Sequence, residues 1–134
     1  MGLRSATLTI TDNGSGSPQS VTLSGTGETP VVKLSTAALT FAAQTVETTS
    51  PSQPVTVTNS GPGTLVIKSI AFTGANPGDF AQTGNCPADL AVNAACTINV
   101  TFTPTATGSR TASMTITDNG SGSPQSVSLT GTGQ

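Results

Sequence analysis

The sequence contains no histidine, tryptophan or tyrosine, and only 7% of its 134 residues are charged. Without histidine, the Ser-His-Asp and Cys-His arrangements of nucleophilic catalysis cannot form, and the commonest transition-metal ligand is missing. The six acidic residues lie far apart along the chain, so the paired carboxylates of a hydrolase are not expected. We therefore predict that the protein is not an enzyme, and that it has no catalytic residue, metal site or cofactor.

The low charge also limits the kinds of partner. Four basic residues and a net charge of −2 leave no basic face for nucleic acid or anionic lipid. No apolar run is long enough to span a bilayer, and the first residues lack the charged and apolar regions of a signal peptide. The absence of tryptophan and tyrosine disfavours a sugar-binding platform. We expect no nucleic-acid partner and no membrane insertion.

The two cysteines, Cys86 and Cys96, are ten residues apart. This spacing excludes a CxxC redox motif, and two thiols without histidine are a poor zinc site. Two interpretations remain open. A disulfide, which we favour, would stabilise the fold by roughly 3 kcal/mol and would indicate an oxidising compartment outside the cytoplasm. The alternative is a pair of free, buried thiols.

The most informative feature is a stretch that occurs twice. Residues 2–27 (GLRSATLTITDNGSGSPQSVTLSGTG) and residues 108–133 (GSRTASMTITDNGSGSPQSVSLTGTG) are identical at 20 of 26 positions, at an offset of 106. A direct repeat with this period indicates a tandem array of small domains. We therefore expect residues 1–27 to be the terminal β-hairpin of a preceding repeat. Residues 28–30 would be a linker, and residues 31–134 a complete domain.

Each copy of the repeat has the pattern of a hairpin. Apolar residues alternate with threonine and serine on both sides of the turn-forming segment DNGSGSP. In the first copy the apolar face would consist of Leu8, Ile10, Val21 and Leu23, without a partner sheet of its own. We expect this face and the hairpin edges to pair with another copy of the chain, either displacing residues 108–133 or docking beside them. Such head-to-tail contacts can grow into filaments. Packing on its own chain, or fraying, is the alternative.

The remaining segments predict a domain made almost entirely of strands. A split edge strand over residues 31–35 and 39–41 is followed by strands over 54–59, 65–73 and 96–103 and by the hairpin. A phase change near Lys68 indicates a β-bulge, and residues 74–94 have no clear pattern. About seven short strands without helical periodicity predict an all-β, immunoglobulin-like β-sandwich. The expected core residues are Leu39, Phe41, Val55, Val57, Leu65, Ile67, Ile70, Phe80, Ile98, Val100, Phe102, Met114, Ile116, Val127 and Leu129.

Several motifs carry a family resemblance. They are the LxFxxQxV frame of Leu39–Val46 and the segments PVTVTNSGPGTLVI, SIAFTGANPGDFAQTGNC, CTINVTFTP and ASMTITDNGSGSPQSVSLTGTG. Together they resemble the Hydin-type, abnormal-spindle-like immunoglobulin domain, as found in tandem repeats of bacterial choice-of-anchor D surface proteins. The resemblance covers residues 30–134. It implies an immunoglobulin-like sandwich in a large secreted or surface protein, with no catalytic or ligand-binding residues to carry over.

These observations favour a structural role. We expect a non-enzymatic spacer or scaffold module of an extracellular surface protein or fibre, whose partners are neighbouring copies of the same domain. The alternative is a ligand-binding adhesin module that recognises its partner through the 74–94 loop, with Asp79 and Phe80 as candidate contact residues. Phenylalanine beneath a long loop is, however, more often a core residue.

Overall fold

Alternating apolar and hydroxyl side chains give the strands one buried and one exposed face. The computed structural model describes residues 2–134. In β5 (Gln53–Asn59), β9 (Ala95–Phe102) and β11 (Gln125–Gly133), every second residue is buried over most of the strand. Within the described residues the only helical segment is the short 3-10 turn η1 (Pro77–Asp79). The all-β prediction is confirmed.

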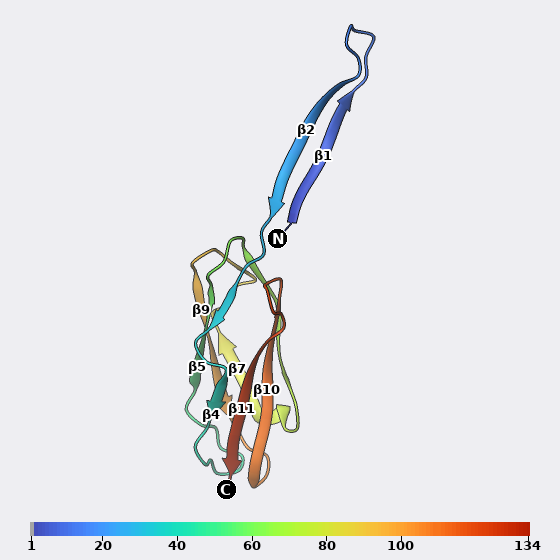
Figure 1. Ribbon diagram of the computed structural model, residues 1–134. Helices are drawn as coiled ribbons and strands as arrows, with labels where there is room; N and C mark the ends of the chain where they lie inside the picture. Colours follow the sequence, from blue (N-terminus) through green and yellow to red (C-terminus); the bar gives the residue numbers. More distant parts are fainter. Residues whose placement is uncertain (1) are drawn as a thin grey trace.

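Two sheets pack face to face around one core (Figure 1). The five-stranded sheet has the order β4-β11-β10-β6-β8, where β4 is Ala38–Thr40, β6 is Leu65–Thr73, β8 is Asp89–Leu90 and β10 is Gly108–Asp118. The four-stranded sheet has the order β3-β5-β9-β7, where β3 is Val32–Leu34 and β7 is Phe80–Gly84. Neighbouring strands are antiparallel except β11 and β4, which are parallel. The fold is therefore the predicted β-sandwich.

The first strand of the domain is split, as predicted. Its two halves, β3 and β4, belong to different sheets, so this short segment ties the two layers together. The predicted bulge is also present. Thr117 lies opposite Ser69 and Asp118 lies opposite Ile67, so Lys68 has no partner residue on β10.

Residues 74–94 are more regular than the sequence suggests. They contain η1, β7 and β8, so the domain has nine strands rather than about seven. β7 pairs with β9 from Phe80↔Phe102 to Gly84↔Ile98, and β8 contributes the single apolar pair Leu65↔Leu90. Both are edge strands in which only one residue is buried. Their alternation is therefore too weak to be recognised in the sequence.

The core closely follows the predicted set. All of the expected residues are buried except Ile67 and Ile70, which lie on either side of the bulge at Lys68 and are partly buried, packed against the core. Leu90 and Cys96 are additional core residues. The rings of Phe41, Phe80 and Phe102 form a cluster with centroid distances of 5.0–5.9 Å.

Cys86 and Cys96 form a disulfide bond. The bond joins the segment between β7 and β8 to the start of β9, and Cys96 is itself part of the buried core. Of the two interpretations of the cysteines, the bridged one is therefore confirmed. The bond fixes the end of the 74–94 region onto a central strand.

Reduction of this disulfide should destabilise the domain without changing its fold. We expect the free energy of unfolding to fall by about 3 kcal/mol, because the unfolded chain then loses a short closed loop. Urea unfolding followed by far-ultraviolet circular dichroism, with and without dithiothreitol, measures the effect. The Cys86→Ser/Cys96→Ser variant is the control, since its stability should not respond to the reductant. Equal unfolding midpoints for oxidised and reduced wild-type protein would contradict the expectation.

Candidate functional site: the N-terminal hairpin

The first two strands form a sheet of their own. β1 (Gly2–Ile10) and β2 (Gln19–Gly27) pair with each other, and among residues 2–134 no third strand joins them. The hairpin projects from the end of the sandwich at which β3 begins, opposite the C-terminus (Figure 1). All residues of both strands are exposed. The alternative in which the hairpin packs on its own chain is therefore not seen.

The register of this hairpin is the same as that of β10–β11. Ala6 lies opposite Leu23 and Leu8 opposite Val21. In the second hairpin the corresponding pairs are Ala112↔Leu129 and Met114↔Val127. The two repeats thus form the same structure, although one lies inside a sandwich and the other projects from its end.

The turns of the two hairpins also have the same hydrogen bonds. The Asp12 carboxylate accepts from the Gly14 amide at 2.6 Å, and the Asp12 amide donates to the Ser17 hydroxyl at 2.9 Å. In the second turn the equivalent bonds, around Asp118, are 2.7 and 2.9 Å long. Turn residues of this kind satisfy their own backbone, so the local sequence is sufficient to define the turn.

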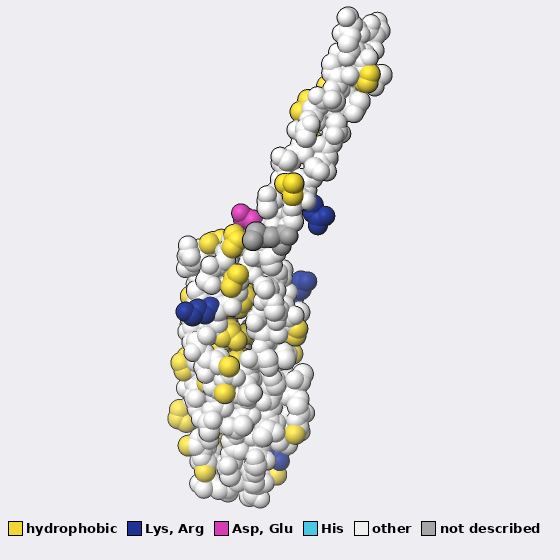
Figure 2. Space-filling model, in the orientation of Figure 1, with side chains coloured by type: hydrophobic (Ala, Val, Ile, Leu, Met, Phe, Trp, Pro, Cys, Tyr) yellow, Lys and Arg dark blue, Asp and Glu magenta, His cyan; other side chains and the backbone are white. Residues whose placement is uncertain are grey.

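What differs between the hairpins is burial. Met114, Ile116, Val127 and Leu129 of β10–β11 are fully buried, whereas the equivalent face of β1–β2 is half exposed. Figure 2 shows apolar side chains scattered along the hairpin surface. The exposed fractions are 50% for Leu8, 49% for Ile10, 49% for Val21 and 49% for Leu23. We call these four residues the hairpin face. Together with the two unpaired strand edges, this face is the candidate interaction surface of the chain.

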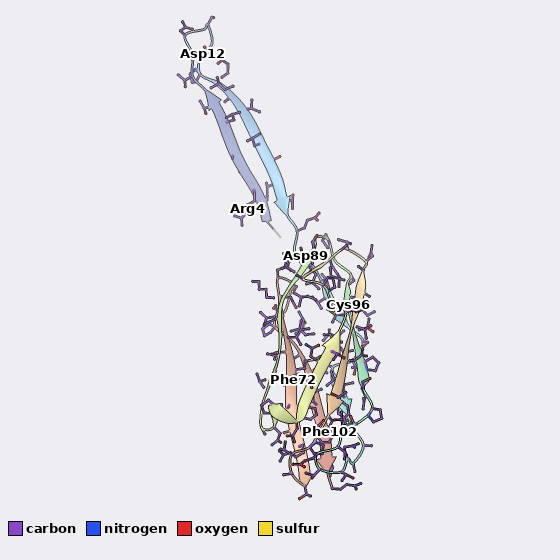
Figure 3. All side chains as sticks on the ribbon, turned by 180° about the vertical axis from the view of Figure 1, so that it is seen from behind. Arg4, Asp12, Phe72, Asp89, Cys96 and Phe102 are labelled. Atoms are coloured by element: carbon purple, nitrogen blue, oxygen red, sulfur yellow. A yellow bond between two sulfur atoms is a disulfide. The ribbon has the colours of Figure 1, made fainter. Side chains whose placement is uncertain are left out.

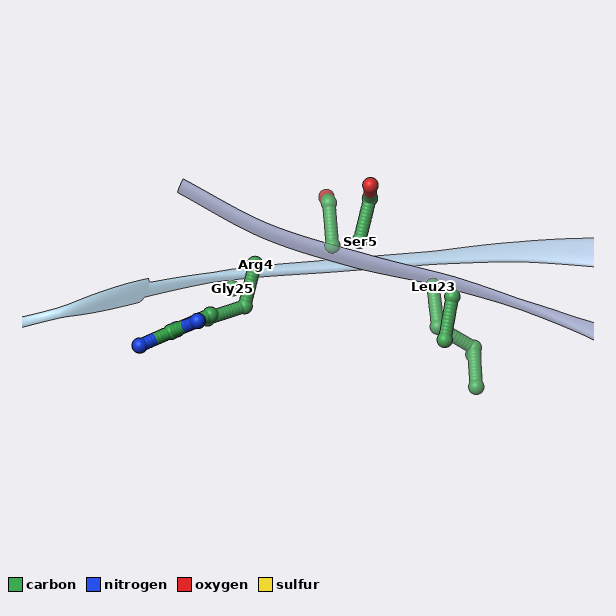
Figure 4. Close-up of a pocket in the computed structure, with 6 residues that line it drawn as sticks. Arg4, Ser5, Leu23 and Gly25 are labelled. Carbon is green, nitrogen blue, oxygen red and sulfur yellow. The ribbon is translucent and has the colours of Figure 1, made fainter. Parts of the chain in front are cut away.

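A shallow hollow of about 250 Å³ lies at the base of the hairpin. Its lining residues are Arg4, Ser5, Ala6, Leu23, Ser24 and Gly25. Figure 4 shows that Arg4 and Leu23 project from one side of the ribbon, whereas Ser5 projects from the other. The hollow therefore extends the hairpin face towards the linker, and Arg4 adds a positive charge to it.

The linker is held against the sandwich. Pro30 is fully buried, and its carbonyl accepts a hydrogen bond from the Ser121 amide at 3.0 Å. The Ser60 amide donates to the Val31 carbonyl at 2.9 Å. A Cβ on Gly61 would lie 2.3 Å from the Val31 amide nitrogen, so glycine permits this close approach. The sequence predicts a linker at residues 28–30 but not its packing against the sandwich, for which the glycines of NSGPGT are the only signal.

The candidate recognition residues of the 74–94 loop are internal. Phe80 is 4% exposed and belongs to the ring cluster, and Asp79 is 3% exposed. The Asp79 carboxylate accepts hydrogen bonds from Arg110 Nε at 2.5 Å and from the Thr105 hydroxyl at 2.8 Å. Neither side chain presents a surface to a ligand. The sequence did not reveal that Asp79 would find its partner on β10.

Ionisation of Asp79 contributes to stability. Burial opposes the charged form, but hydrogen bonds from Arg110 and Thr105 and the Arg110 charge outweigh it, so the pKa of Asp79 lies below its ordinary value. The folded state consequently binds fewer protons than the unfolded state at acid pH. The stabilisation is complete above the unfolded pKa, about 4, and is lost as the pH falls through the lower folded pKa.

The variant Asp79→Asn should therefore lose stability mainly at neutral pH. We expect its free energy of unfolding at pH 7 to be about 2 kcal/mol lower than that of the wild type, and its decrease towards pH 2 to be shallower. Urea unfolding between pH 2 and 7 measures both. The exposed Asp89 provides the matched control, since Asp89→Asn should change stability by less than about 0.5 kcal/mol. Parallel pH curves for wild type and Asp79→Asn would exclude this role.

Other kinds of site find little support in the part of the chain that the structure describes. From residue 2 to 134, no three His, Cys, Asp or Glu side chains are grouped so that they could hold a metal ion. Over the same residues, no helix has the length and apolar character needed to cross a membrane. The hairpin remains the candidate site.

Comparisons with solved structures show what the fold is similar to. A protein of unknown function from Porphyromonas gingivalis W83 matches 98% of this chain with a TM-score of 0.66 and 14% identity. This chain covers 66% of that protein. The ASH/PapD-like domain 7 of human CEP192 matches 77% of the chain, which covers 84% of that domain, with a TM-score of 0.56 and 15% identity. At these identities the likeness concerns the fold alone.

A further similar structure is the VesB protease of Vibrio cholerae, with a TM-score of 0.57 and 14% identity over 77% of this chain but only 31% of the protease. No curated protein matches the sequence. The profile of one family, however, matches residues 30–126, which include the whole sandwich except most of β11. The chain therefore belongs to the ASH family, the abnormal spindle-like microcephaly-associated, ASPM-SPD-2-Hydin family.

Proposed function

We propose that this chain is a non-enzymatic structural module, a spacer or scaffold, of an extracellular surface protein or fibre made of tandem ASH domains. One observation carries the proposal. The chain contains two hairpins of nearly the same sequence and the same register, and only one of them is covered by a sandwich. The uncovered hairpin has the apolar face of core strands but no sheet packed against it. The last two strands of a preceding repeat, separated from the rest of that repeat, would have this structure.

The connection between hairpin and sandwich supports this assignment. We call residues 28–107 the body. The slot is the space between β4 and β6, which the β10–β11 hairpin fills. The linker of three residues reaches at most about 10 Å, whereas β11, with nine residues, is roughly 30 Å long. In the slot of its own body, β2 would end at the far end of the sandwich, out of reach of Pro30. The body that covers the hairpin must therefore belong to another domain.

The array that follows from this connection is extended. The chain enters the sandwich beside the hairpin and leaves it at the opposite end (Figure 1). Successive domains would thus stack end to end, with short linkers held as Pro30 and Val31 are held here. The match to the longer Porphyromonas gingivalis protein spans 98% of this chain, and so includes the hairpin as well as the sandwich. The likeness in fold is therefore not confined to the sandwich.

The disulfide supports an extracellular location, because reducing compartments do not maintain structural disulfides. The short linker and the low content of charged residues also suit a spacer. The alternative is an adhesin that binds through residues 74–94. Its two candidate contact residues, Asp79 and Phe80, are buried and so are not available to a ligand. We therefore favour the structural role.

Joining a second body to the chain tests the proposal directly. In a fusion that places residues 28–107 immediately before Gly2, the N-terminal hairpin follows a body just as residues 108–133 do. We expect the amides of β1 and β2 to become as protected from hydrogen exchange as those of β10 and β11, because burial and strand pairing now cover them. A fusion carrying Leu23→Asp is the control and should lose this protection. Unprotected β1 and β2 in the parent fusion would refute the proposal.

The isolated chain should also assemble weakly from head to tail. At high concentration we expect light scattering after size exclusion to show oligomers of the full chain, because the hairpin face and edges are uncovered. A chain that begins at Glu28 should remain monomeric and should unfold at nearly the same temperature. If both chains stayed monomeric at every concentration, assembly of the wild-type chain through its uncovered hairpin would be ruled out.

A further inference from the structure

The base of each hairpin contains an arginine opposite a glycine. In β10–β11 the pair is Arg110↔Gly131, and in β1–β2 it is Arg4↔Gly25. Both pairs lie on the face that carries the apolar residues. Along each strand they are two residues from the pairs Ala112↔Leu129 and Ala6↔Leu23, respectively. The sandwich therefore shows which groups such a pair accepts.

The glycine makes room for an aromatic ring. A Cβ on Gly131 would lie 2.5–2.9 Å from three ring atoms of Phe102, so only glycine allows the ring to sit there. Phe102 is fully buried and stacks on Phe80 at a centroid distance of 5.0 Å. Gly25 has the same position in β2, but a Cβ there would meet no described atom within 4 Å. The hollow at the base of the hairpin is thus the place that a phenyl ring fills in the sandwich.

The arginine of the pair binds a carboxylate. Arg110 donates to Asp79 and, through a second nitrogen, to the Thr105 hydroxyl at 3.0 Å. Arg4 is exposed, and its side chain has no hydrogen bond or ion pair with any residue from 2 to 134. Figure 3 shows it at the foot of the hairpin, far from Phe102. Its equivalent partner is missing together with the ring.

We propose that Arg4, Ala6, Leu23 and Gly25 form a socket that binds a phenyl ring and a carboxylate held side by side, namely Phe102 and Asp79 of a second copy of this chain. The two groups are presented as a unit, since the Thr103 amide donates to the Asp79 carbonyl at 2.8 Å and Phe80 stacks on Phe102. The inference rests on the proposed role of β1–β2 as the terminal hairpin of a repeat. It adds the groups that the hairpin recognises.

In the wild type this socket competes with the resident hairpin. Each chain carries two hairpins and one slot, so exchange leaves one hairpin uncovered and gains little. The variant Gly131→Val removes the competition, because its new side chain clashes with Phe102 and excludes β10–β11 from the slot. Only the N-terminal hairpin of another copy, with Gly25 intact, then fits.

We therefore expect Gly131→Val to fold in a concentration-dependent manner and to form head-to-tail oligomers, measured by circular dichroism and light scattering over a dilution series. Adding Gly25→Val should abolish the oligomers, and adding Arg4→Ala should raise the concentration needed for assembly by at least about tenfold. Gly25→Val alone is the matched control. It should remain folded like the wild type, because nothing lies near the added side chain.

A second measurement covers the outcome in which Gly131→Val does not fold at any concentration. A synthetic peptide of residues 2–27 is added in excess, and recovery of the β-sheet signal is followed. The wild-type peptide should restore it, whereas peptides with Gly25→Val or Arg4→Ala should do so poorly. Failure of the wild-type peptide would overturn both the socket and the equivalence of the two hairpins.

Two other outcomes would overturn the socket alone. Gly131→Val could remain a monomer of wild-type stability, which would show that the ring does not need the glycine. Oligomers of Gly131→Val could persist unchanged with Gly25→Val, which would show assembly through another part of the hairpin. In either case protection of β1 and β2 in the fused tandem chain would still support the proposed function.

Discussion

The sandwich depends on one hairpin that closes it. β10–β11 fills the slot between β6 and β4, and its apolar side chains Met114, Ile116, Val127 and Leu129 are fully buried between the two sheets. Without them, the buried side chains of β5 and β9 and the cluster of three phenylalanine rings would be exposed on one side. Because this closing piece is also the last segment of the sandwich, it brings the chain to the end of the sandwich opposite the N-terminal hairpin (Figure 1).

Much of the sandwich could be predicted from the sequence, because apolar and polar residues alternate in strands that have one buried face. The repeat at an offset of 106 identified the hairpins, and the phase change at Lys68 identified the bulge. Where the alternation is short, prediction failed. β7 and β8 each bury a single apolar residue, so the sequence pattern indicates neither the strands within residues 74–94 nor the burial of Leu90.

The candidate site was predictable only in part. The hairpin face follows from local pattern, but the joint at Gly61 and the pairing of Asp79 with Arg110 depend on contacts between residues more than 29 positions apart. No local signal specifies such contacts. The same holds for the socket. The sequence around Arg4 and Gly25 does not mark them as a binding site. Their role can be inferred only because the equivalent pair, Arg110 and Gly131, contacts Asp79 and Phe102 in the sandwich.

The topology also suits a module that carries load along an array. Force along the array would enter where the hairpin joins the sandwich and leave at the C-terminus, at opposite ends of the sandwich (Figure 1). The parallel pairing of β4 with β11 continues past β4, with Gln44 and Val46 donating to the carbonyls of Thr132 and Gln134 at 2.9 and 3.0 Å. Hydrogen bonds between neighbouring strands run across the strand direction, so a pull along the long axis loads them in shear. They must then break together rather than one after another, and the proposed spacer would resist extension through the same hairpin that closes its core.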